Sequence, residues 1–580
     1  MFFRAVWLAA VLAISSPAQV LSVPLGTPCP GGLSAAPLLG LSSPLSVGQS
    51  SSLVALNLPS PSTGFLVMGW DNHSWNGQSL PIDLGAFGLG GCDLHVRPDT
   101  VSAFAGFSSW RQWLVQVPMM PILQGMRLSA QAFVADPTPA ASGLAATAGL
   151  EMPLGPWTTL VQSMTQVTRH GITFVFEQPV PVGQFVNGDW FVVGPCRVID
   201  MQPPTATVGG RVMHGAMLDP DPSLLEQGYD SGLYGPLHGH LYKPTLNVGW
   251  VSPANPLALS VGQSLIKSKS LINSPTHANL QTAAVLTVVG QPPSLGAFRP
   301  PYVGNRTPQT LQFEESMLDW SVLANLTPAP GGPRPSDLES RFERVWLDHC
   351  PSWLGRMLHP LENMPDYGRD LAALYAKAAL LINSDYSVSE KRRLTLELVQ
   401  IGIDNYGILA AGGRWPADGG HNAGRKLPIL LAGKMLGFQD MLDVGRDYVS
   451  RRLPDGTSFN YFGEDGQTFF VEETSPGVIN FGGGGYTIAD LGLPDWGVLH
   501  VDAPWNDDRT WYGNQYRTCC TANGWLGHVL TAHVMGLVDD WNHPPLFAYT
   551  DRYVDIEPPG WTRSWDSWVG AMWDLYRGHF

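Results

Sequence analysis

Lysine is nearly absent from the first half of this chain, where Lys243 is the earliest one. Charged side chains make up only 14% of the 580 residues, and the 48 acidic ones outnumber the 33 basic ones. Binding to nucleic acid depends on neutralising phosphates with lysine and arginine. The net charge of −15 therefore argues against nucleic acid as a partner of this protein.

Sequence motifs that mark several common chemistries are missing as well. The chain has no P-loop, no G-x-G-x-x-G after a strand, no G-x-S-x-G elbow and no H-E-x-x-H helix. No cysteine pair has the spacing of a zinc site, because the one close pair, Cys519–Cys520, is vicinal. Nucleotide-dependent, α/β-hydrolase and zincin chemistries are therefore disfavoured. We predict no bound cofactor, with Ca²⁺ left open as the one metal ion that the carboxylates at Glu464, Asp465 and Glu473 suit.

Long apolar runs are also lacking, since no segment after the N-terminus reaches the ~18 residues that a membrane span requires. The N-terminus has the order of an export signal, with a basic start at Arg4, an apolar run over residues 5–14 and small residues at 16–18. We therefore predict that residues 1–21 are a signal peptide. The mature protein is then secreted, to the periplasm, the cell surface or the medium, without a membrane span.

The six cysteines fit an exported protein, because an even number in an oxidising compartment favours disulfides. Cys29 and Cys92 lie together in the first β-rich segment, so we predict that they form a disulfide. The vicinal cysteines can close on each other, pair separately or stay partly free. The partners of Cys196 and Cys350 are left open at this point.

The first half of the chain predicts two strand-rich modules, over residues 22–155 and 156–310. Apolar residues recur at period two between Gly-, Pro- and Ser-rich turns, which is typical of antiparallel sandwiches. In the second module, Asn187-Gly188 predicts a tight turn directly before Trp190. So placed, Trp190 can be presented to a sugar ring, although a tryptophan at such a position more often belongs to the core.

The first module also resembles a β module that recurs in secreted proteins of planctomycetes and myxobacteria. The residues that match are Pro81 to Leu84, Gly91 to Leu94 and Leu128 to Ala132. The resemblance covers about 130 residues of this chain. It implies an accessory surface module and no particular reaction.

Residues 311–580 differ in both charge and periodicity. They carry 35 acidic and 21 basic side chains, a balance of −14, against 13 and 11 for residues 22–310. Apolar stripes predict helices over residues 367–381 and 387–403, the second opened by a capping box of Ser387 and Glu390. Further helical patterns cover residues 427–436, 438–448 and 515–535. Successive helices without strands between them indicate stacked helical hairpins.

The densest group of reactive side chains lies in the Gly-rich loop at residues 411–426. The usual pKa of histidine suits His421 to proton transfer near neutrality, and Arg425 can hold a carboxylate in a two-pronged geometry. The alternative is a helix-capping turn, with Asn422 as the cap and His421 on the surface. We expect catalytic roles for His421, Asn422 and Arg425 and substrate binding by Trp415 and Asp418.

This loop and the segment after it resemble the helical-hairpin loops of α/α-toroid polysaccharide lyases, such as the heparinase and alginate-lyase groups. The matching residues are Gly420 to Arg425 and Leu427 to Gly437, about 30 of the 580. The resemblance implies an open toroid whose loops line a cleft. There an Asn, His or Arg neutralises a uronate carboxylate, and a Tyr or His moves protons. Because about 270 residues are few for six hairpins, an incomplete toroid is implied here.

Two further groups of residues are candidates for the same site. Tyr516 and Arg517 open a helical pattern, and a tyrosine whose pKa is lowered by an arginine can serve as base and acid in β-elimination. We therefore add Tyr516 as a catalytic and Arg517 as a substrate-binding candidate. Carboxylates at Glu464, Asp465 and Glu473 suit a glycosidase acid and base, Ca²⁺ ligation or a solvated turn equally.

These patterns predict a multidomain β + α protein, with two antiparallel β-sandwich-like modules followed by a helical-hairpin domain over residues 311–580. Its predicted activity is polysaccharide degradation, with β-elimination on a uronate-containing glycan as the leading reaction. One alternative is glycoside hydrolysis by a carboxylate pair from Asp418, Glu464, Asp465 and Glu473. The other is a non-catalytic surface or carbohydrate-binding protein. Neither the polysaccharide nor the oligomeric state follows from the sequence.

Overall fold

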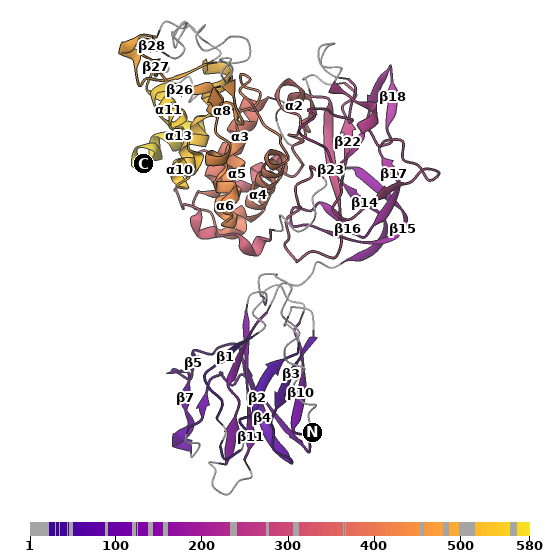
Figure 1. Ribbon diagram of the computed structural model, residues 1–580, viewed down its shortest axis with the longest axis vertical. Coiled ribbons are helices and arrows are strands. Elements are labelled where there is room, and N and C mark those ends of the chain that lie inside the picture. Colours follow the sequence, from indigo (N-terminus) through magenta and orange to yellow (C-terminus); the bar gives the residue numbers. More distant parts are fainter. Residues whose placement is uncertain are drawn as a thin grey trace. The chain divides into compact units, whose positions relative to one another are not determined.

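The computed structural model divides the chain into two compact units, residues 1–158 and 159–580. Figure 1 shows both units, coloured along the sequence. The structure describes residues 22–580 except 30, 34, 43–44, 46–49, 88–90, 119–122, 124–125, 137–142, 155–160, 233–240, 274–277, 305–312, 363–364, 366, 453–457, 480–485, 498–516 and 557–564.

The first unit consists of two larger antiparallel sheets and short hairpins. One sheet has the order β1 (Val23–Leu25), β13 (Gly149–Pro153), β11 (Arg127–Ala135), β4 (Ser62–Gly69) and β9 (Thr100–Gly106), with β12 (Leu144–Ala146) also paired to β11. The other has the order β10 (Trp110–Gln116), β3 (Ser50–Leu56) and β2 (Leu38–Leu41). Both sheets contribute to one core, in which Leu53 and Val115 meet Leu66 and Leu128. Hairpins complete the unit: β5 (Ser74–Trp75) with β6 (Gln78–Ser79), and β7 (Ile82–Asp83) with β8 (Asp93–Leu94).

The predicted disulfide of the first unit is confirmed. Cys29 and Cys92 are bonded to each other, with their Cα atoms 5.1 Å apart. Both cysteines are buried in a small apolar cluster with Val67 and Phe133. The bond therefore ties the segment after β1 to the connection directly before β8, and it supports a unit with its own core.

The second unit begins with an eight-stranded sheet. Its order is β20 (Ala216–Leu218), β22 (Ser264–Ser270), β23 (Leu280–Val289), β16 (Trp190–Val193), β15 (Ile172–Gln184), β17 (Cys196–Gln202) and β21 (Leu257–Leu259), with β14 (Gln162–Arg169) also paired to β15. Strand β16 runs parallel to β23, and the other pairings are antiparallel. The predicted turn between β15 and β16 is present, because Gly188 has φ +84° and lies between the two strands.

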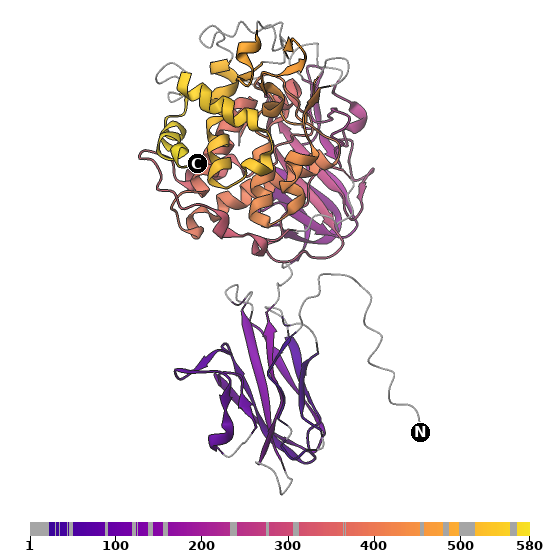
Figure 2. The same cartoon turned by 60° about the vertical axis from the view of Figure 1, so that its left-hand side comes forward.

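The rest of the second unit is largely helical, and its helices gather beside the sheet in both views (Figure 1; Figure 2). The main helices are α2 (Ser352–Leu358), α3 (Gly368–Ile382), α4 (Val388–Ala410), α5 (Lys426–Leu436), α6 (Gln439–Leu442), α7 (Val444–Asp447), α9 (Leu526–Val534), α11 (Pro544–Ile556) and α13 (Ser567–Tyr576). Between α7 and α9 lie the short helix α8 (Gly463–Gln467) and the strands β26 (Thr468–Phe470), β27 (Glu473–Ser475), β28 (Val478–Ile479) and β29 (Pro494–Trp496).

Sheet and helices of the second unit share one hydrophobic core. Ile266 and Val285 of the sheet belong to the same buried cluster as Leu380 of α3, Leu398 of α4 and Leu430 of α5. The second strand-rich segment and the helical segment therefore lie within a single compact unit, which runs from residue 159 to 580.

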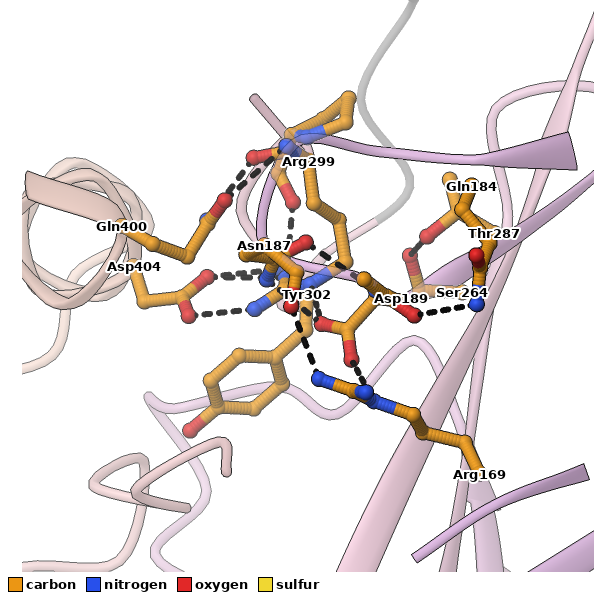
Figure 3. Close-up of polar contacts among 12 residues, drawn as sticks. Arg169, Gln184, Asn187, Asp189, Ser264, Thr287, Arg299, Tyr302, Gln400 and Asp404 are labelled. Atoms are coloured by element: carbon orange, nitrogen blue, oxygen red, sulfur yellow. Dashed lines mark hydrogen bonds and ion pairs between the residues drawn. The ribbon is translucent and has the colours of Figure 1, made fainter. Parts of the chain in front are cut away.

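Arg299 links the sheet to α4 at the centre of a buried polar network (Figure 3). Its guanidinium donates to Asp189 Oδ2 at 2.7 Å, beside the β15–β16 turn, and to both carboxylate oxygens of Asp404 at 3.0 and 2.5 Å. The backbone of Arg299 also exchanges two hydrogen bonds of 2.9 Å with the amide of Gln400. Since Asp404 and Gln400 lie on α4, the network fixes this helix against the sheet.

The coarse fold prediction, a multidomain protein of antiparallel sheets and helices, is confirmed by these elements. Helices α3 and α4 cover the predicted segments, and the capping box of Ser387 and Glu390 is present. Residues 438–448 form two short helices instead of one, with Asp443 between them. Within the described residues, no helix has the length and apolar character that a membrane crossing requires.

Candidate functional site

The Gly-rich loop lies between the end of α4 and the start of α5, and its inner half is buried. The Asn422 side-chain amide donates to the Pro416 carbonyl at 2.6 Å, which closes the loop on itself. Gly424 has φ +90°, and an added Cβ there would run into Ala372 of α3. This position therefore requires glycine, and the loop is held tightly against α3.

His421 and Asp418 form a partly exposed pair at the outer side of this loop. His421 Nδ1 lies 3.2 Å from Asp418 Oδ2, and the exposed fractions of the two side chains are 10% and 24%. A carboxylate in this position orients the imidazole ring. Of the residues predicted in the loop, His421 and Asp418 are the two that the structure pairs in this way.

Tyr367, directly before α3, lies against the His421 ring. The two ring centroids are 5.3 Å apart and the rings meet edge to face. The guanidinium carbons of Arg356 and Arg369 lie 5.0 and 5.3 Å from the centre of the Tyr367 ring. The structure thus brings an imidazole, a phenol and two cations together from α2, α3 and the loop.

A vicinal disulfide joins Cys519 to Cys520 next to this group. Both cysteines are half-buried, and the Arg369 guanidinium donates to the Cys519 carbonyl. A Cβ added at Gly420 would clash with the Cys520 carbonyl and with the Tyr367 hydroxyl. The pairing that the sequence left open is therefore settled for these two cysteines, while Cys196 and Cys350 are free and buried.

Arg425, predicted to hold a substrate carboxylate, instead forms a buried ion pair within the protein. Its guanidinium donates to Asp348 at 3.1 and 3.0 Å, and only 2% of its side chain is exposed. His359 Nε2 lies 2.6 Å from the same carboxylate. Burial alone would raise the pKa of Asp348, but the charges of Arg425 and His359 outweigh it and hold that pKa well below its usual range.

Trp415 is buried behind this ion pair. Its indole nitrogen donates to the Asp348 carbonyl at 3.1 Å, and its ring stacks on Phe462 with the centroids 6.0 Å apart. None of the Trp415 surface is exposed, so in this structure its ring faces contact protein atoms and not a sugar. Its role in the described fold is to pack the loop against α8.

Three carboxylates considered for glycoside hydrolysis lie in different surroundings. Glu464 is buried, accepts a hydrogen bond from the Gly424 backbone at 3.1 Å, and has one oxygen without a hydrogen-bond partner among the described residues. Burial, with the nearby charge of Asp465, raises the pKa of Glu464 to about 7. Asp465 is held by Lys426 at 2.5 Å and by the Trp541 indole at 2.8 Å. Glu473 is exposed on β27 and accepts from the Gly477 backbone.

The remaining predicted residues lie elsewhere or outside the described part. Tyr516 falls outside the described residues, and Arg517 begins a five-residue π-helix, Arg517–Thr521. Trp190 lies on β16, half-buried, and its indole donates to the Thr168 carbonyl at 2.9 Å. It packs on the core of the sheet, far along the chain from the loop. Among the described residues, no group of three or more His, Cys, Asp or Glu is arranged to hold a metal ion.

No sequence pattern indicates Asp348 and His359, and residue 367 is predicted only as the start of a helix. Asp348 and His359 frame α2, and Asp348 is 77 positions from Arg425, so no local spacing signals their contact. Tyr367 and Arg369 did carry a signal, since an aromatic residue, a glycine and a charged pair open a helix there. What that signal could not provide is the long-range contact with the loop.

Comparisons of this chain with known proteins do not assign it to a family. No protein-family model and no curated protein matches the sequence. A transglutaminase of red sea bream is 9% identical at a TM-score of 0.14, over 44% of this chain and 31% of that chain. An Escherichia coli alpha-2-macroglobulin activated by porcine elastase is 10% identical at a TM-score of 0.14, over 92% and 50%. The chain thus spans about a third to a half of the length of these structures. Their TM-scores are too low to indicate a shared fold or function.

Proposed function

We propose that the second unit is a polysaccharide-degrading enzyme that acts by β-elimination on a uronate-containing glycan. The observation that carries this proposal is the contact between the His421–Asp418 pair and Tyr367, with Arg356 and Arg369 at the Tyr367 ring. The same proposal takes the helical hairpins as an incomplete α/α toroid and the first unit as a β-sandwich. It also takes the protein to be exported, which fits its two disulfides.

β-Elimination needs the kinds of groups that this arrangement provides. A base removes the proton at C5 of the uronate, the electron pair forms the C4–C5 double bond, and the C4–O4 bond breaks as an acid protonates O4. His421 and Tyr367 suit the proton transfers because their rings meet at 5.3 Å. A cation that neutralises the carboxylate lowers the cost of the charge that develops there.

Arg356 and Arg369 take the place that the sequence suggested for Arg425. Arg425 is committed to Asp348, and its removal from that ion pair would leave a buried carboxylate without its main partner. Arg356 and Arg369 are half-buried and lie on the Tyr367 side of the loop. Arg369 is already paired with Asp370 and donates to the Cys519 carbonyl, so a substrate carboxylate would share its guanidinium with these groups. A guanidinium can hold a planar carboxylate in a geometry that a lysine cannot copy.

The test is an assay of the purified protein on a panel of uronate polymers, followed by the ultraviolet absorbance of unsaturated products. We expect wild type to form them and His421→Ala to lose about 10²–10⁴-fold in rate, as for other general acids and bases. His579→Ala is the matched control, because His579 is exposed at the C-terminus, away from the loop. Arg356→Ala is expected to lose activity, with Arg446→Ala, an exposed arginine of α7, as its control.

Product chemistry separates this proposal from the two alternatives. New reducing ends without unsaturation would mean hydrolysis and would shift attention to Asp418 and Glu464. If no polymer in the panel is cleaved, the result favours the alternative of a non-catalytic carbohydrate-binding protein. Equal turnover of a uronate polymer and its carboxyl-reduced form would show that no carboxylate is recognised, and would overturn the roles of Arg356 and Arg369.

A further inference from the structure

The three-stranded sheet of the first unit turns one face outward, and the strand register arranges that face in rows. Leu53 and Ala55 of β3 and Val115 of β10 are buried, so the alternate residues of these strands point away from the core. The register then aligns Leu38, Leu56 and Trp110 in one row. Gly40, Val54 and Gln112 form the next row, and Ser52 pairs with Leu114 in the third.

This outward face is apolar, aromatic and uncharged. The exposed fractions are 50% for Leu38, 46% for Leu56, 52% for Trp110 and 65% for Leu114. Phe107, in the turn that leads into β10, is 85% exposed. None of the outward residues in the three rows is ionisable, and the remaining polar ones are amides and hydroxyls.

Such a face is unusual for an open antiparallel sheet in water. The solvent side of these sheets normally carries polar and charged residues, and edge strands are protected by charges, above all lysine. Strand β10 is an edge of its sheet, yet its outward positions are Trp110, Gln112, Leu114 and Gln116. Contiguous exposed apolar residues of this kind mark an interaction surface.

We propose that this face binds a neutral polysaccharide. A pyranose ring offers apolar C–H faces and a rim of hydroxyls, which match the Trp110 ring and the amides of Gln112 and Gln116. Gln112 is already oriented, because its amide nitrogen donates to the Ser52 hydroxyl at 2.6 Å. Its carbonyl oxygen is left to accept from a sugar hydroxyl.

The composition of the face disfavours the other occupants. An anionic polymer or a lipid headgroup would find no opposite charge there and would lose its hydration. A purely apolar partner surface would bury the Gln112 carbonyl oxygen and the Gln116 amide without supplying hydrogen bonds to them. The inference does not rest on the activity proposed for the second unit, since different residues in a different unit carry it.

The experiment measures retardation of the full chain in native gels that contain neutral polysaccharides, namely xylan, glucomannan, mixed-linkage β-glucan and starch. Pull-down on microcrystalline cellulose and chitin extends the panel, with pectate and chondroitin sulfate as anionic polymers. We expect binding to at least one neutral polymer and a loss of about tenfold or more in Trp110→Ala, as for an aromatic anchor. Leu114→Gln is a second variant, which keeps the side chain's bulk and polarises the face.

Trp70→Ala is the matched control, because Trp70 is 41% exposed in the same unit but follows β4 of the other sheet. It is expected to bind like wild type. Absence of binding to every neutral polymer would overturn the proposal, and so would stronger binding to the anionic ones or an equal loss in Trp70→Ala. Sedimentation that shows a dimer dissociated by Trp110→Ala would also overturn it, by assigning the face to a second copy.

Discussion

Arg425 and its partner Asp348 are both almost completely buried, and this burial favours a structural role for the arginine over substrate binding. A buried carboxylate is tolerated only when a partner compensates its charge, and Asp348 has Arg425 and His359 for this purpose. Arg425 also donates to the Ala423 carbonyl at 2.6 Å, so the ion pair and the loop backbone are fixed together. At the residue scale, Arg425 therefore holds the loop of the candidate site in place through its contacts with Asp348 and the Ala423 carbonyl.

The first prediction is that Arg425→Met destabilises the protein by about 3–5 kcal/mol, because it leaves Asp348 with a buried charge and no guanidinium. Urea unfolding of the second unit measures this. Arg392→Met is the matched control, since the ion pair of Arg392 with Glu315 is partly exposed to water, and such pairs are worth about 0–1 kcal/mol. If Arg425→Met unfolds like wild type and loses only substrate affinity, Arg425 binds the substrate after all.

Glu464 gives a second prediction at this scale, for pH dependence. Its pKa is raised from 4.5 to about 7 by burial. Between these values the folded protein holds a proton that the unfolded chain releases, so the stability contributed by Glu464 is present below pH 4.5 and is lost as the pH rises through about 7. This contribution amounts to at most about 3 kcal/mol.

The measurement compares free energies of unfolding at about pH 5 and about pH 8 for wild type and Glu464→Gln. Glu464→Gln is expected to lose less stability than wild type over this interval, because its amide does not titrate. Part of the slope remains, since burial also raises the pKa of Glu397 to about 8. Glu473→Gln, an exposed residue of β27, is expected to follow wild type. Identical slopes for Glu464→Gln and wild type would contradict the assignment.

At the element scale, the first residue of helix α4 is set by a local capping signal between residues close together in the sequence. Ser387 accepts from the Glu390 backbone at 3.3 Å, and Glu390 accepts from the Ser387 backbone at 2.9 Å. We predict that Ser387→Ala destabilises the second unit by about 1 kcal/mol. Ser389→Ala, two residues further on and exposed, is the control and is expected to change the unfolding free energy little. Equal effects of both variants would mean that packing alone sets the start of α4.

Local signals of this kind explain how much could be predicted. The start of α3, the capping box of α4 and the turn at Gly188 all depend on neighbours within a few residues, and the sequence places each of them. The contacts of Arg425 with Asp348, of His421 with Tyr367 and of Arg369 with the Cys519 carbonyl join residues that lie far apart in the sequence. The type of residue in the site was therefore predictable, while the pairs that the residues form were not.

At the scale of the whole molecule, the sheet of residues 162–289 and the helices after residue 311 depend on each other. Part of the buried surface of the sheet, including Ile266 and Val285, belongs to the same core as the helices. Arg299 also joins Asp189 on the sheet side to Asp404 of α4. The first unit differs, because its cores consist only of its own residues and its disulfide closes within it. Cooperative unfolding should therefore follow the two compact units rather than the change from strands to helices.

The last prediction concerns fragments cut at these boundaries. A fragment of residues 159–580 is expected to fold, with a sharp thermal transition and helical circular dichroism. A fragment of residues 311–580 is expected to be insoluble or to lack a cooperative transition, because it exposes the apolar surface that Ile266, Val285 and their neighbours cover. A fragment of residues 22–158 serves as the positive control for independent folding. Cooperative unfolding of residues 311–580 alone would show that the helices form a separate domain and that the core shared with the sheet is dispensable.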